Sequence, residues 1–328
     1  MYRKPFAILL TLLTLISFRT TAQQITVSEG VLTDNARNRK VPYKLYRPTT
    51  LEGVYPIIIF SHGLGGSKNA AAYLGKHLAA HNYIAVHIQH HGSDESIWQG
   101  ANSREEAVNM LSKSIRNPQS AVNRFNDVPF VIDELEELNN NDDILKGHLD
   151  LSKIGMAGHS YGGKSTMVAA GEKIGRRGFS FKEPRIKAAL VLSPNVPNRQ
   201  VDYEQLYADI DIPMFHMTGT NDEIPIPPNN DLKPEQRQIP YQKMHLSDQY
   251  LLVLKDAVHG TFSGNVLKQS PDEPRNVQHI EAIKDGTLAF FDYYLNQKTE
   301  RLAWLRESYS DTLASEDAFE WKAGDGGH

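Results

Sequence analysis

Residues 153–163 read KIGMAGHSYGG, and this stretch decides the fold. An apolar run leads into residues 158–162 (GHSYG), which match the pattern G-x-S-x-G, and a segment with helical spacing follows. In such an element the serine sits on a tight strand-to-helix turn in a strained backbone conformation, so its hydroxyl projects alone. Strand and helix then pass so closely that Gly158 and Gly162 leave no room for a Cβ atom. The stretch predicts Ser160 as a nucleophile.

Short apolar runs alternate with longer helical segments on both sides of this stretch, which is typical of a mainly parallel sheet covered by helices. The run YPIIIF at 55–60 is typical of a strand buried on both faces. Further strands are expected at 24–27, 41–46, 83–88, 153–157, 186–192, 213–218 and 250–254, the first two as an edge hairpin. Helices are expected at 69–81, 123–138, 163–172 and 276–295. Together with the serine turn, this order predicts an α/β protein with the α/β-hydrolase fold, a mainly parallel central sheet flanked by helices.

A glycine-rich loop, SHGLGG at 61–66, directly follows the strand 55–60. An acyl-transfer enzyme must stabilise an oxyanion, and one backbone N–H donor is worth ~3–4 kcal/mol. We expect one donor from Tyr161, the residue after the nucleophile, and the other from Leu64 in this loop. The alternative is that the glycines only turn the chain, because a single glycine-rich loop is a weak signal.

The remaining catalytic groups follow later strands. In this fold the chain order is serine, then an acid, then histidine. Asp222 follows the strand 213–218, at the loop tip where the acid belongs, and the adjacent Glu223 is the alternative. His259 follows the last predicted strand and is the best candidate for the base. The carboxylate would orient the imidazole and stabilise its cation.

Four other histidines fit the role of base less well. His62 precedes the serine and is interpreted as a residue that holds its loop through hydrogen bonds. His159 lies inside the turn and is expected to be packed. His245 lies before the last strand and His279 lies inside the C-terminal helix, so either would need an unusual geometry.

The irregular segment 90–119 follows a central strand, where substrate contacts are expected. We therefore predict three residues close to the substrate, which are His62, His91 and Trp98. One alternative is a zinc site, because histidines and carboxylates cluster here as His87, His90, His91, Asp94 and Glu95. Their spacing matches no metalloenzyme motif, so neither a metal nor an organic cofactor is predicted.

The composition is that of an ordinary globular protein with a formal net charge of −4 among 328 residues. Nucleic acid and anionic membranes require a basic surface, so neither is expected as a partner. The absence of cysteine excludes disulfides, thiolate metal sites and a cysteine nucleophile. We expect residues 23–328 to form a single domain, with 92–120 a possible insertion near the site and 307–328 a polar, flexible tail. The sequence does not predict the oligomeric state.

The first 22 residues resemble a secretory signal peptide. Arg3 and Lys4 precede an apolar run at 6–18, and small residues at 20–22 suit cleavage after Ala22. The run is short for a bilayer span, and an uncleaved anchor is the alternative. We expect an exported protein, periplasmic or secreted, with no stable membrane insertion after the signal is removed.

Several of these stretches resemble the platelet-activating-factor acetylhydrolase and dienelactone-hydrolase-like branch of the α/β-hydrolases. They are FSHGLGGSK at 60–68, GHSYGG at 158–163, and NRFNDVPFVIDELEELN at 123–139, which is similar to the branch pattern R-x-x-D-V-x-F-V-x-D-x-L. The pattern falls on Arg124, Asp127, Val128, Phe130, Val131, Asp133 and Leu135. The resemblance covers about residues 40–295 and implies an oxyanion hole formed by Leu64 and Tyr161.

The sequence departs from the branch at two points. Animal members that resemble it place the acid soon after the strand 186–192, whereas residues 192–195 here read LSPN, without a carboxylate. Asp222 is the acid of the commoner hydrolase arrangement, which argues against a phospholipid acetylhydrolase in the strict sense. True dienelactone hydrolases use a cysteine nucleophile, which this chain lacks.

These residues predict a serine hydrolase that cleaves small-molecule or lipid-like carboxylic esters through an acyl-enzyme. A peptidase or a thioesterase would use the same triad. A non-catalytic binding protein of the same fold is the alternative from another class, although such proteins usually lack a triad residue.

Overall fold

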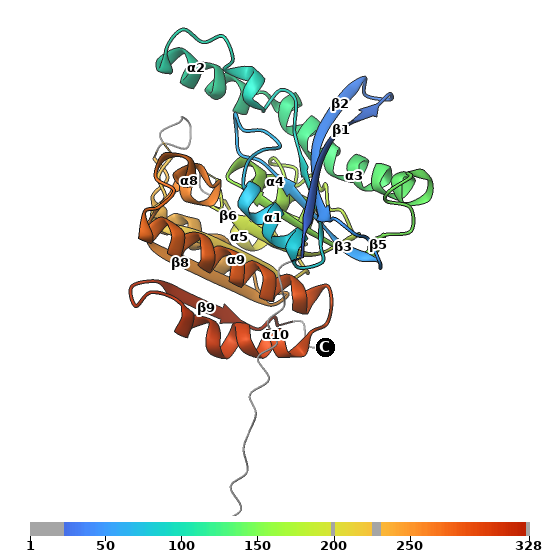
Figure 1. Cartoon of the computed structure of the whole chain (residues 1–328). Coiled ribbons are helices and arrows are strands. Elements are labelled where there is room, and N and C mark those ends of the chain that lie inside the picture. The colour runs from blue at the N-terminus through green and yellow to red at the C-terminus, as the bar shows by residue number, and fades with distance from the viewer. Residues whose placement is uncertain (1–22, 198–200, 225–230, 326–328) are drawn as a thin grey trace, which may run out of the picture.

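The structure is a computed structural model that describes residues 23–197, 201–224 and 231–325 (Figure 1). The predicted signal peptide at 1–22 lies outside the described residues. Among the described residues, none of the helices combines the length and apolar character that a bilayer crossing requires.

A nine-stranded sheet runs through the described part of the chain, in the strand order β1-β2-β4-β3-β5-β6-β7-β8-β9. The strands are β1 (Ile25–Asp34), β2 (Arg39–Pro48), β3 (Tyr55–Ser61), β4 (Ile84–Ile88), β5 (Leu149–His159), β6 (Ile186–Leu192), β7 (Met214–Asn221), β8 (Gln249–Val258) and β9 (Ala318–Lys322). The inner strands from β4 to β8 are parallel, and β1, β2 and β9 are antiparallel to their neighbours. This is the mainly parallel sheet that the alternation of segments predicted, including the edge hairpin.

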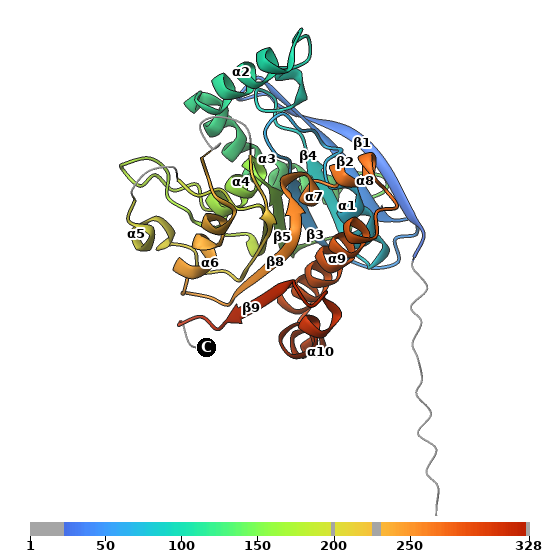
Figure 2. The same cartoon turned by 90° about the vertical axis from the view of Figure 1, so that its left-hand side faces the viewer.

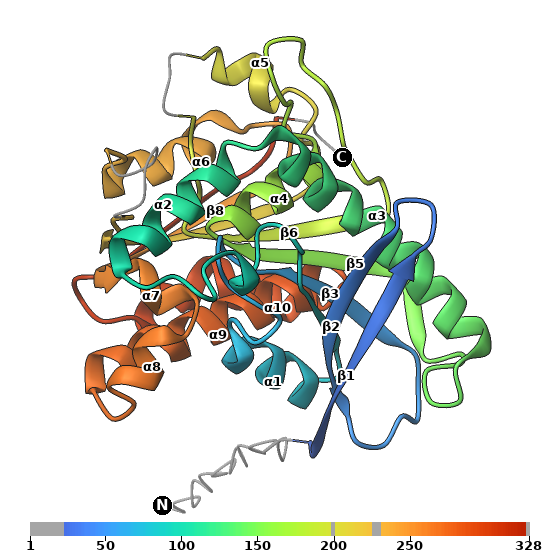
Figure 3. The same ribbon diagram turned by 90° about the horizontal axis from the view of Figure 1, so that it is seen from above.

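Helices cover both faces of the sheet (Figure 3). One face carries α1 (Ala72–Ala80), α9 (Pro274–Tyr294) and α10 (Thr299–Ala303), and the other carries α3 (Pro118–Asn141) and α4 (Tyr161–Ala170). The remaining α-helices are α2 (Arg104–Ile115), α5 (Tyr203–Tyr207), α6 (Ile239–Lys243), α7 (His259–Phe262) and α8 (Asn265–Gln269). Short 3-10 turns include η1 (Glu95–Ile97), η2 (Pro234–Gln238) and η4 (Tyr309–Thr312), and η3 (Trp304–Ser308) is a π-helical turn.

Strand β3 shows why the sheet has a core on each side. Ile57 and Ile59 belong to the apolar cluster under α3, whereas Ile58 and Phe60 belong to the cluster under α1 and α9. Successive side chains of a strand point to opposite faces, so a strand covered on both faces must be apolar throughout. Each such side chain contributes roughly 1.5–3 kcal/mol by leaving water.

Two helices begin earlier or run longer than the sequence predicted. Helix α3 starts at Pro118 because Asn117 caps it, accepting a hydrogen bond from the backbone N–H of Gln119 at 3.0 Å. The segment 90–119, expected to be a loop with short helices, contains the 12-residue helix α2, which Ser103 caps through the N–H of Glu106. Both capping residues are short polar residues of a type that is also common in turns, so in the sequence alone they are weak indicators of a helix start.

The C-terminal segment differs from the predicted flexible tail. Residues 318–322 form β9, which pairs antiparallel with β8 and closes that edge of the sheet (Figure 2). The Phe319 ring lies 4.9 Å from the ring of Tyr309 and 5.9 Å from that of Phe215, measured between centroids. The polar composition concealed this strand, because a single inward aromatic ring anchors it while its neighbours face solvent.

We predict that Phe319→Ala destabilises the protein by about 2 kcal/mol, less than a fully buried phenylalanine would, because the ring is only partly buried. The matched control is Glu320→Ala on the exposed face of the same strand, which should change stability by less than about 0.5 kcal/mol. Urea denaturation followed by tryptophan fluorescence measures both. Equal midpoints for the two variants would show that β9 is not anchored by this ring.

Candidate active site

Ser160 is the one residue between the end of β5 and the start of α4. Its backbone lies at φ 55° and ψ −114°, a conformation that is unfavourable for a residue with a Cβ. The N–H of Ser160 donates to the carbonyl of Leu192 at 2.9 Å, which fixes the turn against the end of β6. The strained conformation predicted from the motif is therefore present in the structure.

The glycines of the turn permit a very close approach of three backbone segments. A Cβ on Gly162 would lie 1.8 Å from the carbonyl oxygen of Ser61, and one on Gly158 would lie 2.2 Å from the carbonyl oxygen of Gly162. A Cβ on Gly163 would lie 2.9 Å from a methyl group of Val191. Contacts this short require Cα atoms without a Cβ. The strand-to-helix turn at residues 158–163, here called the elbow, therefore forms only with glycine at these positions.

Asp222 and His259 come together although 37 residues separate them. The carboxylate Oδ1 of Asp222 accepts a hydrogen bond from Nδ1 of His259 at 2.7 Å, and its Oδ2 accepts from the hydroxyl of Thr218 at 2.9 Å. An ionised carboxylate can only accept, so Nδ1 carries a proton, and in the neutral form of the imidazole Nε2 then keeps its lone pair. The pair is thus arranged as a base and its orienting acid.

Asp222 is fully buried, and its charge is nevertheless maintained. Burial by itself would raise its pKa, but the adjacent His259, its hydrogen bond and the Arg237 guanidinium together lower the pKa to about 2. The carboxylate is therefore ionised throughout the neutral range. Glu223, the alternative acid, takes no part in the hydrogen bond to the imidazole.

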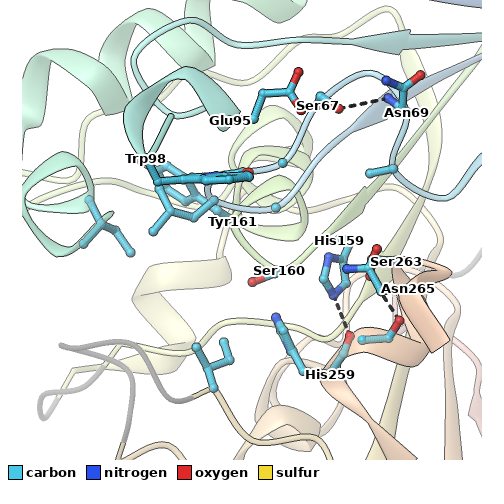
Figure 4. Close-up of a pocket in the computed structure, with 18 of the residues that line it drawn as sticks. Ser67, Asn69, Glu95, Trp98, His159, Ser160, Tyr161, His259, Ser263 and Asn265 are labelled. Atoms are coloured by element: carbon cyan, nitrogen blue, oxygen red, sulfur yellow. Dashed lines mark hydrogen bonds between the residues drawn. The ribbon is translucent and has the colours of Figure 1, made fainter. Parts of the chain in front are cut away.

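The hydroxyl of Ser160 and the ring of His259 face the same cavity (Figure 4). No direct hydrogen bond joins them in the described part of the chain, as is common before a substrate is bound. His159 packs behind the base, with ring centroids 4.6 Å apart, and its Nε2–H donates to the backbone carbonyl of His259 at 3.1 Å. Burial holds the pKa of His159 well below its usual value, so this ring is a neutral packing group, as predicted.

The glycine-rich loop after β3 lies beside the serine. A Cβ on Gly63 would be 3.4 Å from the Cβ of Ser160, and both Gly63 and Leu64 line the cavity. Tyr161 is the first residue of α4, and the N–H groups at a helix start have no partner within the helix. The loop itself is held by the N–H of Gly65, which donates to the carbonyl of Ser93 at 2.9 Å. The placement of the loop is compatible with the predicted donors, whose role remains a prediction.

A buried arginine holds this loop against the elbow helix. Arg124 has no exposed surface, and its Nε donates to Ser165 Oγ at 2.7 Å. Its Nη2 donates to Ser61 Oγ at 2.9 Å and to the carbonyl of His62, and its guanidinium lies 4.7 Å from the centre of the Tyr161 ring. One side chain therefore connects β3, α3 and α4 directly behind the glycine-rich loop at 61–66.

A buried ion cluster around Asp127 lies next to Arg124 and contacts the same Ser61 hydroxyl through His90. Asp127 accepts two hydrogen bonds of 2.7 Å from Arg39 and one of 2.9 Å from Nδ1 of His90, and Nε2 of His90 lies 2.9 Å from Ser61 Oγ. Burial alone would raise the pKa of Asp127, but these partners lower it to about 2. Sequence reasoning placed Arg124 and Asp127 in a motif without finding this role, because their partners come from four separate segments.

The three residues predicted to lie near the substrate have different surroundings in the structure. Trp98 lines the cavity, and its indole N–H donates to the carbonyl of Gly65 at 2.7 Å. His62 is buried instead: its Nε2 accepts from the N–H of His90 at 3.0 Å, so its Nδ1–H must donate to the carbonyl of Gly63. This agrees with a residue that holds the loop. His91 is nearly half exposed, lies 3.0 Å from Asp94 and is not among the cavity-lining residues, and its place beside the substrate stays a prediction.

Of the histidines and acids that suggested a metal site, His91 and Asp94 meet each other, with His91 Nδ1 3.0 Å from Asp94 Oδ2, and the other histidines bind elsewhere. His87 Nδ1 donates to the carbonyl of Ala70 at 3.0 Å, and both ring nitrogens of His90 are engaged in the cluster described above. Asp94 accepts from Gln89 and Ser96. Among the residues that the structure describes, no three such side chains converge as metal ligands would.

The cavity above Ser160 has a volume of about 450 Å³, within the usual range for small-molecule sites. Figure 4 shows Trp98 and Tyr161 on one side of it and His259 on the other. Several lining residues were not predicted from the sequence. They are Glu95, Ile115, Asn195, Ile224, Asn265 and Lys268.

Known proteins resemble this chain in sequence. The sequence model of the family described as platelet-activating factor acetylhydrolase, isoform II, matches residues 19–124. The platelet-activating factor acetylhydrolase of Cavia porcellus is 26% identical over 289 residues, which cover 78% of this chain and 61% of that protein. That of Canis lupus familiaris is 25% identical over 143 residues, covering 36% of this chain and 32% of that protein.

The chain has the α/β-hydrolase fold, and its sequence is similar to those of platelet-activating factor acetylhydrolases. The resemblance predicted from the motifs is confirmed, and the matched residues include the loop 60–68 and Arg124. The matched parts span less than two thirds of these relatives. The similarity is therefore to a family of esterases, over part of the length of its members.

We predict that Gly162→Ala destabilises the protein by about 3 kcal/mol or more, because a Cβ there would meet the Ser61 carbonyl at 1.8 Å. The matched control is Gly53→Ala, where a Cβ would have no neighbour within 4 Å. That variant should match or slightly exceed the wild-type stability in urea denaturation. A Gly162→Ala protein as stable as the control would contradict the close approach.

Acid should destabilise the protein through the buried carboxylates. Their pKa of about 2 lies below the unfolded value of ~3.9, so their stabilisation is complete above about pH 4 and is lost as the pH falls toward 2. Asp127→Asn should cost about 3–5 kcal/mol at pH 7 by leaving Arg39 and His90 without their partner. It should also flatten the loss of stability between pH 4 and 2. Denaturation at a series of pH values tests both effects, and an unchanged slope would contradict the assignment.

Proposed function

We propose that the protein is a serine hydrolase of carboxylic esters, with Ser160 as nucleophile, His259 as base and Asp222 as acid. The observation that carries this proposal is the 2.7 Å bond from His259 Nδ1 to Asp222. It selects the tautomer whose Nε2 can take up a proton, in the ring that faces the Ser160 cavity. The strained turn that exposes the Ser160 hydroxyl supports the same role.

The reaction follows from these positions. Nε2 of His259 takes the hydroxyl proton as Ser160 Oγ attacks the ester carbonyl, and the carbonyl oxygen becomes an oxyanion beside the N–H groups of Leu64 and Tyr161. The intermediate collapses, His259 returns the proton to the leaving alcohol, and an acyl-enzyme remains. Water then attacks with His259 again as base, which releases the carboxylic acid and restores the Ser160 hydroxyl.

The substrate class follows from the cavity and from the relatives. A cavity of about 450 Å³ accommodates a short acyl group together with part of its alcohol. The relatives are named platelet-activating factor acetylhydrolases, that is, for the removal of an acetyl group. We therefore assign small-acyl esters of lipid-like or other small alcohols, because a short acyl group fits the confined space between Trp98 and His259.

We predict that a fluorophosphonate probe labels the protein once and that the label is lost in Ser160→Ala. Turnover of p-nitrophenyl acetate should fall by roughly 10⁴-fold or more in Ser160→Ala, and by about 10⁴-fold in Asp222→Asn, because the histidine would lose its orienting acceptor. The control is Ser152→Ala, an exposed serine on β5 that lies away from the cavity.

The labelled residue is read by intact-mass and peptide mass spectrometry. A wild-type protein that is folded, unlabelled and inactive on short and medium p-nitrophenyl esters would contradict the proposal and favour a binding protein of the same fold. Turnover confined to thioesters or peptides would retain the triad and overturn the ester assignment.

A further inference from the structure

A second buried arginine lies behind the acid of the proposed triad. Arg237 belongs to η2, and its side chain has no exposed surface. Arg237 and Arg124 are the largest fully buried side chains in the described part of the chain. A guanidinium removed from water is costly unless its N–H groups find acceptors, so its partners show what the charge does.

Arg237 connects the acid of the triad to a neighbouring strand end. Its Nε donates to the backbone carbonyl of Asp222 at 2.8 Å and lies 3.3 Å from the Asp222 carboxylate Oδ1. Its Nη1 donates to the carbonyl of Pro194 at 2.9 Å, with the carbonyl of Ser193 and the side-chain oxygen of Asn195 each at 3.4 Å. The contacts thus join the residues after β7 to the residues after β6.

The sheet itself does not make this connection. The β6–β7 ladder ends at the pair Leu192 and Met217, whereas β7 continues to Asn221 before Asp222. Just past that pair, the N–H of Ser193 still donates to the carbonyl of Met217 at 2.7 Å, and β7 stays paired with β8 as far as Asn221 and Val258. The ladder does not join the residues after Ser193 to those from Thr218 to Asp222. Arg237 supplies N–H donors to both ends at this point, so it replaces the missing rungs of the ladder.

We infer that Arg237 is a positioning residue of the triad, which holds Asp222 where its carboxylate accepts the Nδ1–H of His259. This inference rests on the proposed function and adds a residue to it. Arg237 does not line the cavity, so it acts on the substrate only through Asp222 and His259.

The charge of Arg237 has a consequence for pH dependence. The titratable groups around the Asp222–His259 pair are His159 from the elbow, which is neutral, Arg237 from η2, and Glu95 and Lys268, which line the same cavity from η1 and α8. Arg237 is the cation in contact with Asp222, and it disfavours a second positive charge on His259. Removing it would make the protonated imidazole easier to form, so activity would be lost at a higher pH on the acid side.

The experiment compares Arg237→Met and Arg237→Lys with a matched control, Arg306→Met. Arg306 likewise binds a carboxylate, that of Asp248. It belongs to η3, and Asp248 directly precedes the first residue of β8, at the end of that strand away from His259. For each protein, kcat and KM for p-nitrophenyl acetate are measured from pH 4 to 9, together with the melting temperature. Labelling by the fluorophosphonate probe checks that the nucleophile is accessible.

Arg237→Met is expected to lower the plateau kcat by about 10–100-fold with little change in KM, because a displaced acid misaligns the base without touching the substrate. The acid limb of its kcat profile should move up by roughly 0.5–1 pH unit. Arg237→Lys keeps the charge and should keep the limb at the wild-type pH while it recovers part of kcat. Arg306→Met should lower the melting temperature without moving the limb.

The inference is overturned if Arg237→Met is folded, has a plateau kcat within about twofold of Arg306→Met and shows the wild-type acid limb. If Arg237→Met does not fold, Arg237→Lys decides, since a shifted limb with the charge retained would contradict the electrostatic role. A wild-type protein without esterase activity would reject the proposed function alone. In that case, the titration midpoint of the His259 ring, followed by NMR in wild type and Arg237→Lys or Arg237→Met, still tests whether the guanidinium acts on the Asp222–His259 pair.

Discussion

The bare Cα of Gly162 is the constraint on which the rest of the structure depends. It lets the first turn of α4 press against the carbonyl of Ser61 at the end of β3, closer than any side chain would permit. That approach puts Ser160 and the loop containing Leu64 on the same wall of one cavity. Because the inner strands are parallel, Asp222 and His259 arrive at the same edge of the sheet from β7 and β8, and no further bending of the chain is required.

Two buried guanidiniums make this edge rigid. Arg124 ties the loop after β3 to α4, and Arg237 ties the residues after β6 to those after β7. Loops at strand ends have few ladder partners, and a planar group with five N–H donors can satisfy several carbonyls at once. Each charge costs desolvation energy. Serine hydroxyls and the carbonyl of His62 offset this cost for Arg124, and the Asp222 carboxylate and two backbone carbonyls offset part of it for Arg237. The site is therefore held from behind by charges that the substrate does not touch.

The sequence predicts most strands, the elbow and the candidate triad residues, because each is indicated either by a local pattern or by the order of the catalytic groups along the chain. The apolar run at 55–60 and the glycines of 158–163 fix backbone geometry within a few residues, and the order of the fold then assigns Asp222 and His259. What it misses depends on contacts between distant segments. Strand β9 is held by the ring of Phe319 against residues far away in the chain, and the partners of Arg237 carry no sequence pattern.

The central claim is that Ser160, His259 and two backbone N–H groups act on one carbonyl carbon. A crystal structure of the protein inactivated by a small phosphonate tests it most directly, because the phosphorus stands where the tetrahedral carbon would form. The account predicts phosphorus bonded to Ser160 Oγ, with one phosphoryl oxygen about 2.7–3.1 Å from the backbone nitrogens of Leu64 and Tyr161, and His259 Nε2 beside the ester oxygens. A phosphonate on another residue, or one whose oxygen points away from both nitrogens, would contradict it.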